Sequence, residues 1–339
     1  MLRIGIIGCG GFAGLHGKAI AEMADASVVA LCDVNEDITR GFAERNLQAQ
    51  DSAVEVFHFT STKEFFAEGN LDAAVITSPH TMHFQHACEA LEAGCHVLVE
   101  KPMVTDSAQA RELKERVDQA GKILVIGYNT ACSPEFTFIR EAIRDQRYGP
   151  LEMVTGFLSQ NWKKATVGKW RQDPALSGGG QAYDSGAHLF NSLVWSVESP
   201  IEEVCSQIDF MDTAVDINSV TNIKFQNGVL AAITVSGNSN STAGYTAFIF
   251  EDGIIETDGW FSGWIKIQHK NKPVKYPHIP YEPLTPMQNF VRSIQGQDTP
   301  RTGPINGVHQ AELMDAVYAS AKLGRPVKAS EIKEGKVTA

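Results

Sequence analysis

The sequence predicts an α/β fold in which an N-terminal doubly wound domain with a parallel sheet is followed by an α+β domain with a large open, mostly antiparallel sheet. Two patterns predict this order. Up to about Gly127, short apolar runs alternate with helical patterns, whereas beyond Pro150 apolar and polar residues alternate with a period of two. The length of 339 residues agrees, because one domain takes about 150 residues.

In the first part, repeated strand–helix units predict a parallel sheet with helices on both faces. We therefore expect residues 1–127 to form a nucleotide-binding domain and residues 128–339 to form a second domain for substrate binding and oligomerisation. The expected strands of the first domain are Leu2–Ile7, Val28–Cys32, Val54–Phe59, Ala73–Ile76, His96–Val99 and Ile123–Ile126.

In the second part, two alternating strands flank Asn227-Gly228, a pair that favours a tight hairpin turn. The inward residues of these strands are Ile217, Ser219, Thr221, Ile223 and Phe225, then Val229, Ala231, Ile233 and Val235. Further strands are expected at Tyr245–Phe250, Ile254–Thr257 and Trp264–Gln268. A helix should begin at Thr285-Pro286, and another should run from about Asn306 to Leu323, before Gly324.

Composition excludes several classes of partner. The net charge is −11 and neither half is basic, whereas nucleic-acid binding needs clustered Lys and Arg. No apolar run reaches the roughly 18 residues of a membrane span, and strand-like sequence follows Met1 directly, which leaves no room for a leader. The six cysteines form no Cys-x-x-Cys pair. We expect a cytoplasmic protein with reduced thiols and without a nucleic-acid or membrane partner.

A glycine-rich loop follows the first predicted strand and opens the first helix. Its residues are Gly8, Cys9, Gly10, Gly11, Phe12 and Ala13. In this context Gly8 permits a tight turn, Gly10 lets the backbone approach a pyrophosphate, and the small Ala13 allows the helix to pack close to the strand. The loop predicts a dinucleotide site.

Asp33 ends the second predicted strand, where a carboxylate can accept hydrogen bonds from the adenosine ribose hydroxyls. Asp33 can also serve as the N-cap of the next helix, and the two interpretations are compatible. Val34 and Asn35 follow, so no cation stands directly beside the carboxylate to bind a 2′-phosphate, although Arg40 is near in sequence. The pattern favours NAD over NADP.

Two further segments carry candidate catalytic groups. Glu100-Lys101-Pro102 follows the fifth predicted strand, at the sheet edge where ligands bind. Asp184 and His188 are spaced i, i+4 at the predicted start of a helix, which places a carboxylate and an imidazole on one face. Histidine titrates near pH 6.5 and lysine near 10.4, so we expect His188 to act as base, Lys101 to donate a hydrogen bond to the substrate oxygen and Asp184 to orient the imidazole.

Taken together, these motifs resemble the Gfo/Idh/MocA oxidoreductase family over nearly the whole chain. The motifs that carry the resemblance are Gly8–Ala13, Thr77-Ser78-Pro79 with His83, Glu100-Lys101-Pro102, Trp170-Arg171, Gly178–Gly180, Asp184 with His188, and Ala316–Ser320. The resemblance implies an N-terminal Rossmann domain, a C-terminal open sheet that often makes the oligomer contact, and a catalytic set of Lys101, Asp184 and His188 in a sugar or cyclitol dehydrogenase. It also suggests a cis peptide between Lys101 and Pro102.

The resemblance extends to the residues that bind the two ligands. The cofactor set expected beside Gly8, Gly10, Gly11, Phe12, Ala13 and Asp33 is Ser78, Pro79, His83, Glu100, Lys101, Asn129, Trp170 and Arg171. The substrate set is Lys101, Asn161, Trp162, Lys163, Tyr183, Asp184 and His188. Two positions depart from the family pattern: Asn191 stands where an aspartate is frequent, and Asn129 where many relatives have a basic residue.

Three functions remain open at this point. The first is a dehydrogenase that moves hydride between a secondary hydroxyl of a sugar, glycoside or cyclitol and NAD. The alternatives are a non-catalytic dinucleotide-sensing regulator and an NAD-dependent glycosidase. No metal is expected, because His80, His83 and His86 lack further ligands at a familiar spacing. Helices can cover only one face of the open second sheet. We expect a second copy of the chain to cover the other face, which is rich in small or polar residues, in a homodimer or homotetramer.

Overall fold

The computed structural model describes residues 1–260 and 263–337. Within these residues the chain forms two compact units. The first unit contains Met1–Val104, Ala108–Gly127 and Thr285–Ile305, and the second contains the remaining described residues. One segment of the first unit ends at Gly127. The chain then returns to the first unit at Thr285, so the first of the two C-terminal helices belongs to that unit.

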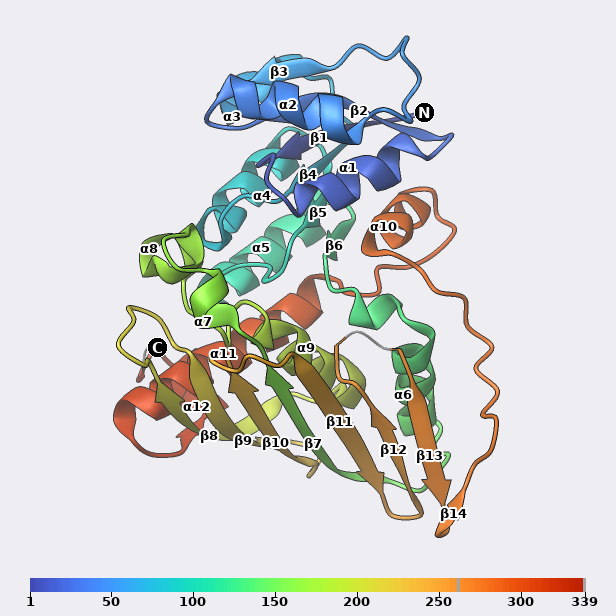
Figure 1. Cartoon of the computed structure of the whole chain (residues 1–339), viewed down its shortest axis with the longest axis vertical. Coiled ribbons are helices and arrows are strands. Elements are labelled where there is room, and N and C mark those ends of the chain that lie inside the picture. The colour runs from blue at the N-terminus through green and yellow to red at the C-terminus, as the bar shows by residue number, and fades with distance from the viewer. Residues whose placement is uncertain (261–262, 338–339) are drawn as a thin grey trace. The chain divides into compact units, whose positions relative to one another are not determined.

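In the described residues, the first unit is built on a six-stranded parallel sheet in the order β3-β2-β1-β4-β5-β6, which confirms the predicted doubly wound fold (Figure 1). The strands are β1 (Leu2–Ile7), β2 (Ala26–Cys32), β3 (Phe57–Phe59), β4 (Ala73–Ile76), β5 (His96–Val99) and β6 (Leu124–Ile126). The helices are α1 (Ala13–Ala21), α2 (Glu36–Asn46), α3 (Thr62–Glu68), the short 3₁₀ helix η1 (His80–Met82), α4 (His83–Glu92), α5 (Ser107–Ala120) and α10 (Pro286–Ile294). β3 is shorter than expected because Val54 lies in a turn, its N–H bonded to the Asp51 carbonyl at 3.0 Å.

Helices cover both faces of this sheet. Ile6 packs in a cluster with residues of α1, α2 and α10, whereas its neighbour Ile7 packs with Phe65 of α3. Successive side chains of a strand point to opposite faces, and both of these are nearly fully buried. The strand order reverses between β1 and β4, which is where doubly wound sheets bind their ligands.

In the described residues, the second unit contains a nine-stranded sheet in the order β14-β13-β12-β11-β7-β10-β9-β8-β15, antiparallel except between β7 and β10. Its strands are β7 (Leu151–Ser159), β8 (Ile201–Asp209), β9 (Asn218–Phe225), β10 (Leu230–Ser236), β11 (Ala243–Phe250), β12 (Gly253–Thr257), β13 (Ile265–His269), β14 (Lys272–Pro273) and β15 (Val327–Lys328). Its helices are η2 (Thr130–Cys132), α6 (Pro134–Arg144), α7 (Trp162–Ala165), η3 (Trp170–Gln172), α8 (Pro174–Ser177), α9 (Gly186–Val197), α11 (Pro304–Leu323) and α12 (Ala329–Lys333).

The predicted hairpin joins β9 to β10. Gly228 in its turn has a φ of +92°, a backbone conformation that favours glycine. Along β10, Ile233 is buried while Thr234 is exposed, and the same alternation runs through β9. The period of two in the sequence therefore corresponds to one buried and one exposed face.

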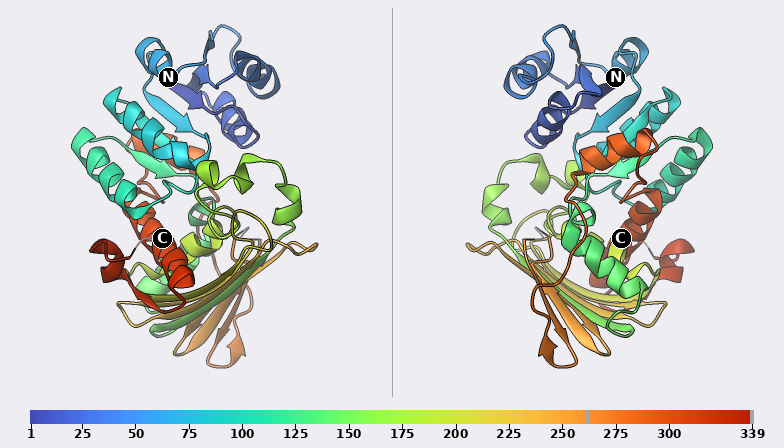
Figure 2. Two further views of the ribbon diagram at one scale, coloured as in Figure 1. Left: turned by 90° about the vertical axis from the view of Figure 1, so that its left-hand side faces the viewer. Right: turned by 90° about the vertical axis from the view of Figure 1, so that its right-hand side faces the viewer.

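Helices α6, α9 and α11 lie on one side of this sheet (Figure 2) and form the main core of the unit with its buried residues. The opposite face carries exposed apolar side chains on neighbouring strands, namely Met153, Phe157, Val220 and Leu230. We call this surface the open sheet face.

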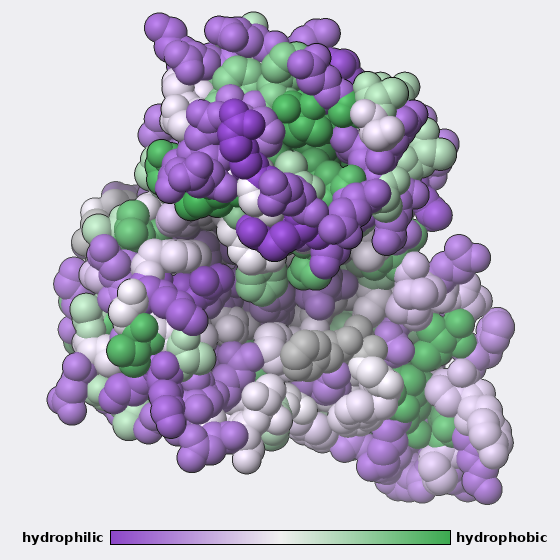
Figure 3. Space-filling model, turned by 45° about the horizontal axis from the view of Figure 1, so that its top comes forward, coloured by the Kyte–Doolittle hydropathy of each residue, from purple (hydrophilic) through white to green (hydrophobic). Residues whose placement is uncertain are grey.

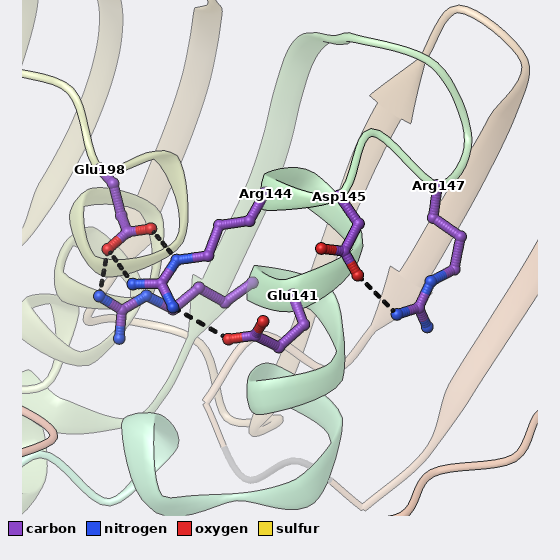
Figure 4. A network of polar contacts seen from close by, with 6 residues as sticks. Glu141, Arg144, Asp145, Arg147 and Glu198 are labelled. Atoms are coloured by element: carbon purple, nitrogen blue, oxygen red, sulfur yellow. Dashed lines mark hydrogen bonds and ion pairs between the residues drawn. The ribbon is translucent and has the colours of Figure 1, made fainter.

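A carboxylate joins the ends of α6 and α9 (Figure 4). Glu198, just after α9, accepts a hydrogen bond from Arg144 Nε at 2.5 Å and another from Arg140. The Arg140 guanidinium also lies 4.2 Å from the ring centroid of Trp195. Burial by itself would raise the pKa of Glu198, but the hydrogen bonds from both arginines outweigh it and hold that pKa below its usual value.

The face shown in Figure 3 carries mostly hydrophilic side chains with smaller hydrophobic groups between them. Within the described part of the chain, no helix combines the length and the apolar character needed to span a bilayer.

Candidate active site

The glycine loop lies where β1 ends, beside the turn that follows β4. Gly8 has a φ of +87°, and a Cβ there would lie 2.7 Å from the Ser78 nitrogen. Thr77 Oγ1 is 2.9 Å from the Ile7 carbonyl oxygen, and the Thr77 N–H donates to that oxygen. The structure thus brings the predicted residues Gly8 and Ser78 together at the switch point, and only glycine fits the close approach.

The next two glycines leave space for a ligand. A Cβ added at Gly10 or Gly11 would meet no atom within 4 Å, so both backbones are open to close approach. Ala13 begins α1, and the positive end of the helix dipole at this N-terminus favours an anion. Phe12 is 53% exposed. These features fit the pyrophosphate of a dinucleotide.

Asp33 follows β2, and its Oδ2 accepts a hydrogen bond from the Cys9 N–H at 2.8 Å. Its carboxylate thereby holds the glycine loop while remaining partly exposed. Asn35 is the N-cap of α2 and accepts from the Asp37 N–H, so the N-cap interpretation of Asp33 is wrong. Val34 is 92% exposed, and its side chain offers no cation beside Asp33.

Glu100-Lys101-Pro102 follows β5, and the Lys101–Pro102 peptide is cis, as expected. Glu100 Oε1 lies 2.8 Å from His16 Nε2 of α1, and Glu100 Oε2 accepts from the Lys101 N–H at 3.2 Å. Burial would raise the pKa of Glu100, but the hydrogen bond with His16 and its charge lower it below the usual value. Lys101 is 6% exposed. The ionised Glu100 therefore fixes the backbone that carries Lys101.

His83 connects this segment with the turn after β4. Its Nδ1 is 2.7 Å from the Pro102 carbonyl oxygen, and its Nε2 is 2.9 Å from the Ser78 carbonyl oxygen. The ring is fully buried, and burial lowers the His83 pKa despite both contacts. His83 was expected among the cofactor-binding residues. In the structure its buried ring links the backbone carbonyls of Ser78 and Pro102.

The histidines around His83 have other partners. Ser78 Oγ lies 2.9 Å from His86 Nδ1, and the rings of His80 and His83 meet edge to face. Among residues 1–260 and 263–337, no group of three or more His, Cys, Asp or Glu side chains is placed to hold a metal ion.

In the second unit, Asp184 is the centre of a cluster of predicted residues. Its Oδ2 accepts hydrogen bonds from Trp162 Nε1 at 2.8 Å and from Arg171 Nε at 3.0 Å. The Arg171 guanidinium lies 4.4 Å from the ring centroid of Trp170. Asp184 and Trp162 are both about 5% exposed or less. The cluster joins α7, η3 and the turn before α9.

The expected helical placement of Asp184 is wrong. Helix α9 begins at Gly186, so His188 lies in its first turn while Asp184 lies in the preceding turn. Residues 181–185 form that turn because the Gly186 N–H bonds to the Gln181 carbonyl at 2.8 Å. The His188 ring packs edge to face with Tyr128 and Trp260, at centroid distances of 5.9 and 5.8 Å.

The other predicted residues of this unit are more dispersed. Tyr183 is buried and stacks on Tyr318, and burial raises its pKa well above the usual value. Lys163 donates to the Met211 carbonyl at 2.6 Å. Asn161 precedes α7 and is half-buried, and Asn129 is exposed before η2. Asn191 is fully buried and donates to Asn306 Oδ1 of α11 at 2.7 Å.

Sequence reasoning missed His16, Tyr128, Asp216, Trp260 and Tyr318. His16 sits one turn into α1 and carries no local signal of its partner, Glu100, 84 residues away. Tyr318 belongs to the Ala316–Ser320 motif, which could have drawn attention to it.

The fold and the glycine loop define a dinucleotide-binding protein with a second α+β unit. Residues 2–128 match the model of the oxidoreductase family with an NAD-binding Rossmann fold, and residues 136–256 match that of the GFO/IDH/MocA C-terminal domain. The chain therefore belongs to the GFO/IDH/MocA family of oxidoreductases.

Among curated relatives, the chain is similar to D-glucoside 3-dehydrogenase of Escherichia coli strain K12, with 23% identity over 96% of this chain and 97% of the relative. It is also similar to a scyllo-inositol 2-dehydrogenase (NADP(+)) of Bacillus subtilis strain 168, with 21% identity over 96% and 95%. Among solved structures, the WlbA dehydrogenase of Bordetella pertussis, in complex with NADH and UDP-GlcNAcA, matches with a TM-score of 0.81 and 24% identity over 96% and 98%. That likeness establishes the fold alone.

Proposed function

We propose that this oxidoreductase is an NAD-dependent dehydrogenase that moves hydride between a secondary hydroxyl of a sugar, glycoside or cyclitol and the nicotinamide. The carrying observation is the placement of Lys101, an almost fully buried cation at the carboxyl edge of the sheet that bears the glycine loop. Burying a cation costs free energy, and a protein that only binds a dinucleotide has no need of such a group. The named activities of the relatives agree with a sugar or cyclitol substrate.

The residues proposed to hold the cofactor are those of the first unit. The open backbones of Gly10 and Gly11 and the N-terminus of α1 suit the pyrophosphate. Asp33 suits the ribose hydroxyls, and its carboxylate would repel a 2′-phosphate. NAD is therefore favoured over NADP. Bound there, NAD would supply the hydride acceptor.

Proton transfer is assigned to this chain's own side chains. As the substrate C–H gives up its hydride, the O–H proton passes to the neutral imidazole of His188. Lys101 donates a hydrogen bond to the oxygen on which negative charge develops. Asp184, fixed by Trp162 and Arg171, binds a neighbouring hydroxyl and favours the imidazolium form of His188.

The open sheet face supports an oligomer. Its apolar side chains Met153, Phe157, Val220 and Leu230 are each 41–53% exposed in the single chain. A contiguous exposed apolar surface on a soluble domain marks an interaction site, and a second copy of the same face is self-complementary about a two-fold axis. We include a homodimer or homotetramer through this face in the proposal.

The function is tested by following reduced nicotinamide in a screen of inositols, aldoses and glycosides. Net formation of NADH with a free sugar or cyclitol supports the dehydrogenase. Release of sugar from a glycoside without net NADH would assign the glycosidase instead. Tight NAD binding without turnover on any compound would assign the regulator.

A further inference from the structure

Three glycines in a row, Gly178 to Gly180, precede the turn that carries Asp184. The proposed phosphate site lies at the glycine loop of Gly8 to Ala13, so phosphate binding does not explain this second run. A Cβ at Gly180 would lie 2.0 Å from the Asp216 carbonyl oxygen, and one at Gly179 would lie 2.5 Å from the Tyr318 hydroxyl. These glycines are therefore required by close packing against two residues that the proposed mechanism does not use.

Asp216 binds this segment through both its carboxylate oxygens. Oδ1 accepts from the Gly180 N–H at 2.6 Å, and Oδ2 accepts from the Ala182 N–H at 2.7 Å. The Gln181 N–H between them donates to the Asp216 backbone carbonyl at 2.9 Å. Asp216 is 1% exposed, and burial raises the pKa of its carboxyl group although the hydrogen bonds from Tyr318, Ala182 and Gly180 oppose the rise. Three consecutive backbone amides are thus bound to one residue.

Tyr318 of α11 completes the cluster. Its hydroxyl donates to Asp216 Oδ1 at 2.5 Å, and its ring stacks on Tyr183 with centroids 5.9 Å apart. The Asp184 N–H then donates to the Gly180 carbonyl at 2.9 Å. A continuous chain of contacts therefore runs from Tyr318 through Asp216 and Gly180 to Asp184.

We propose that Asp216 and Tyr318 are positioning residues, which hold the Gly180–Ala182 backbone so that Asp184 and the start of α9 with His188 keep their catalytic geometry. This role rests on the proposed function of Asp184 and His188. Neither Asp216 nor Tyr318 needs to touch the substrate. The proposal also accounts for Gly179 and Gly180 and for Tyr318 of the Ala316–Ser320 motif with one set of contacts.

Two variants separate the contacts. Tyr318→Phe removes the hydroxyl but keeps the ring that stacks on Tyr183. Asp216→Asn places an amide donor against the Gly180 or the Ala182 N–H, because both carboxylate oxygens accept from the backbone. Ser320→Ala is the matched control: its buried hydroxyl lies on the same helix, but it contacts the Ser206 N–H and the Arg325 carbonyl.

The test has a readout that does not depend on activity. Trp162 Nε1–H donates to Asp184 Oδ2, so its indole ¹⁵N–¹H resonance, assigned with Trp162→Phe, reports the place of that carboxylate. We expect this resonance to shift in Tyr318→Phe and in Asp216→Asn but not in Ser320→Ala. With a substrate from the screen, kcat should fall roughly 10-fold in Tyr318→Phe and on the order of 10²-fold in Asp216→Asn, while the Kd for NAD by calorimetry stays unchanged.

An unmoved indole resonance in Tyr318→Phe would overturn the proposal. A variant with a lowered melting temperature but with the wild-type kcat and resonance would also overturn it, because loss of stability alone indicates a purely structural role. A shifted resonance with unchanged kcat would also overturn it. If the wild-type protein oxidises no compound, the proposed function fails, and the resonance alone decides whether Tyr318 and Asp216 hold Asp184. Failure of Asp216→Asn to fold leaves Tyr318→Phe as the deciding variant.

Discussion

In the proposed reaction His188 accepts the proton and Lys101 stabilises the developing negative charge. The ordinary pKa values of these two side chains differ. Near neutral pH an imidazole can accept the hydroxyl proton, whereas an ammonium group is already charged and suited to donate a hydrogen bond. Replacing His188 by Asn, or Lys101 by Ala, should therefore each lower kcat by roughly 10²–10⁴-fold. The Kd for NAD should change little, and Asp184→Asn should cost somewhat less in kcat.

The pH dependence of kcat/KM separates the two roles. If His188 is the base, activity falls on the acidic side as its imidazole becomes protonated. This acidic limb should persist in the residual activity of Lys101→Ala and disappear in His188→Asn. The reverse pattern would assign the base to Lys101.

The proposed preference for NAD over NADP rests on Asp33. Its carboxylate should favour NAD over NADP by about tenfold or more, because a 2′-phosphate would lie against it. Asp33→Ser should narrow this difference, but it also removes the bond to the Cys9 N–H. Val34→Arg keeps that bond and adds a cation at a 92% exposed position, and we expect it to raise NADP affinity by on the order of 0.5–1 kcal/mol. Calorimetric titration of both cofactors checks this; equal or tighter binding of NADP by the wild type would contradict it.

At the scale of elements, Glu198 ties α6 to the end of α9 through Arg140 and Arg144 (Figure 4). The folded-state pKa of Glu198 lies below its unfolded value, so the stabilisation is fully present above the unfolded pKa of about 4.3 and is lost as pH falls through the lowered folded pKa. Glu198→Gln should therefore lower the melting temperature at pH 7 by a few degrees, and the difference from wild type should shrink below about pH 4.

A matched control for this charge is Asp252→Asn, whose carboxylate pairs with Lys270 at 3.6 Å in the turn after β11 and is 44% exposed. Exposed pairs contribute little to stability, so this variant should keep the wild-type melting temperature. An equal loss in both variants, or a loss in Glu198→Gln that is independent of pH, would refute the assigned role of Glu198.

Elements were predictable wherever local chemistry determines them. The Thr285-Pro286 pair predicted the start of α10, and Thr285 indeed forms a capping box with Gln288. Asp184 was assigned to a helix because the i, i+4 spacing is typical of one, yet Asp216, 32 residues away, binds the preceding backbone in a turn. The partners of His16 and Asp216 are likewise distant in sequence, and no local pattern encodes them.

At the scale of the whole molecule, local sequence patterns likewise did not predict that the chain returns to the first unit at Thr285. The apolar spacing of Met287, Phe290 and Val291 predicted an amphipathic helix, but amphipathicity does not name the surface that the helix covers. These residues pack in the core of the first unit with Ile4 and Val28. The two patterns of alternation, by contrast, sufficed to predict both sheets.

The open sheet face predicts a stable oligomer. Light scattering at micromolar concentration should give a particle of at least twice the 36.9 kDa of one chain. Val220→Glu should lower this mass, because it buries a charge in the proposed interface. Ile305→Glu introduces the same charge at a comparably exposed position outside the open sheet face and should leave the mass unchanged. A wild-type particle with the mass of a single chain would contradict the assembly.

The proposed function requires that a carbon-bound hydrogen of a sugar or cyclitol moves directly to the nicotinamide. Isotope transfer measures this step: the enzyme is given a substrate from the screen with deuterium at its carbinol carbons, and the mass of the reduced cofactor is determined. We expect one deuterium per reduced nicotinamide, formed by the wild type and lost in Lys101→Ala and His188→Asn. Reduced cofactor without deuterium, or product formed with no net reduction of NAD, would contradict direct hydride transfer.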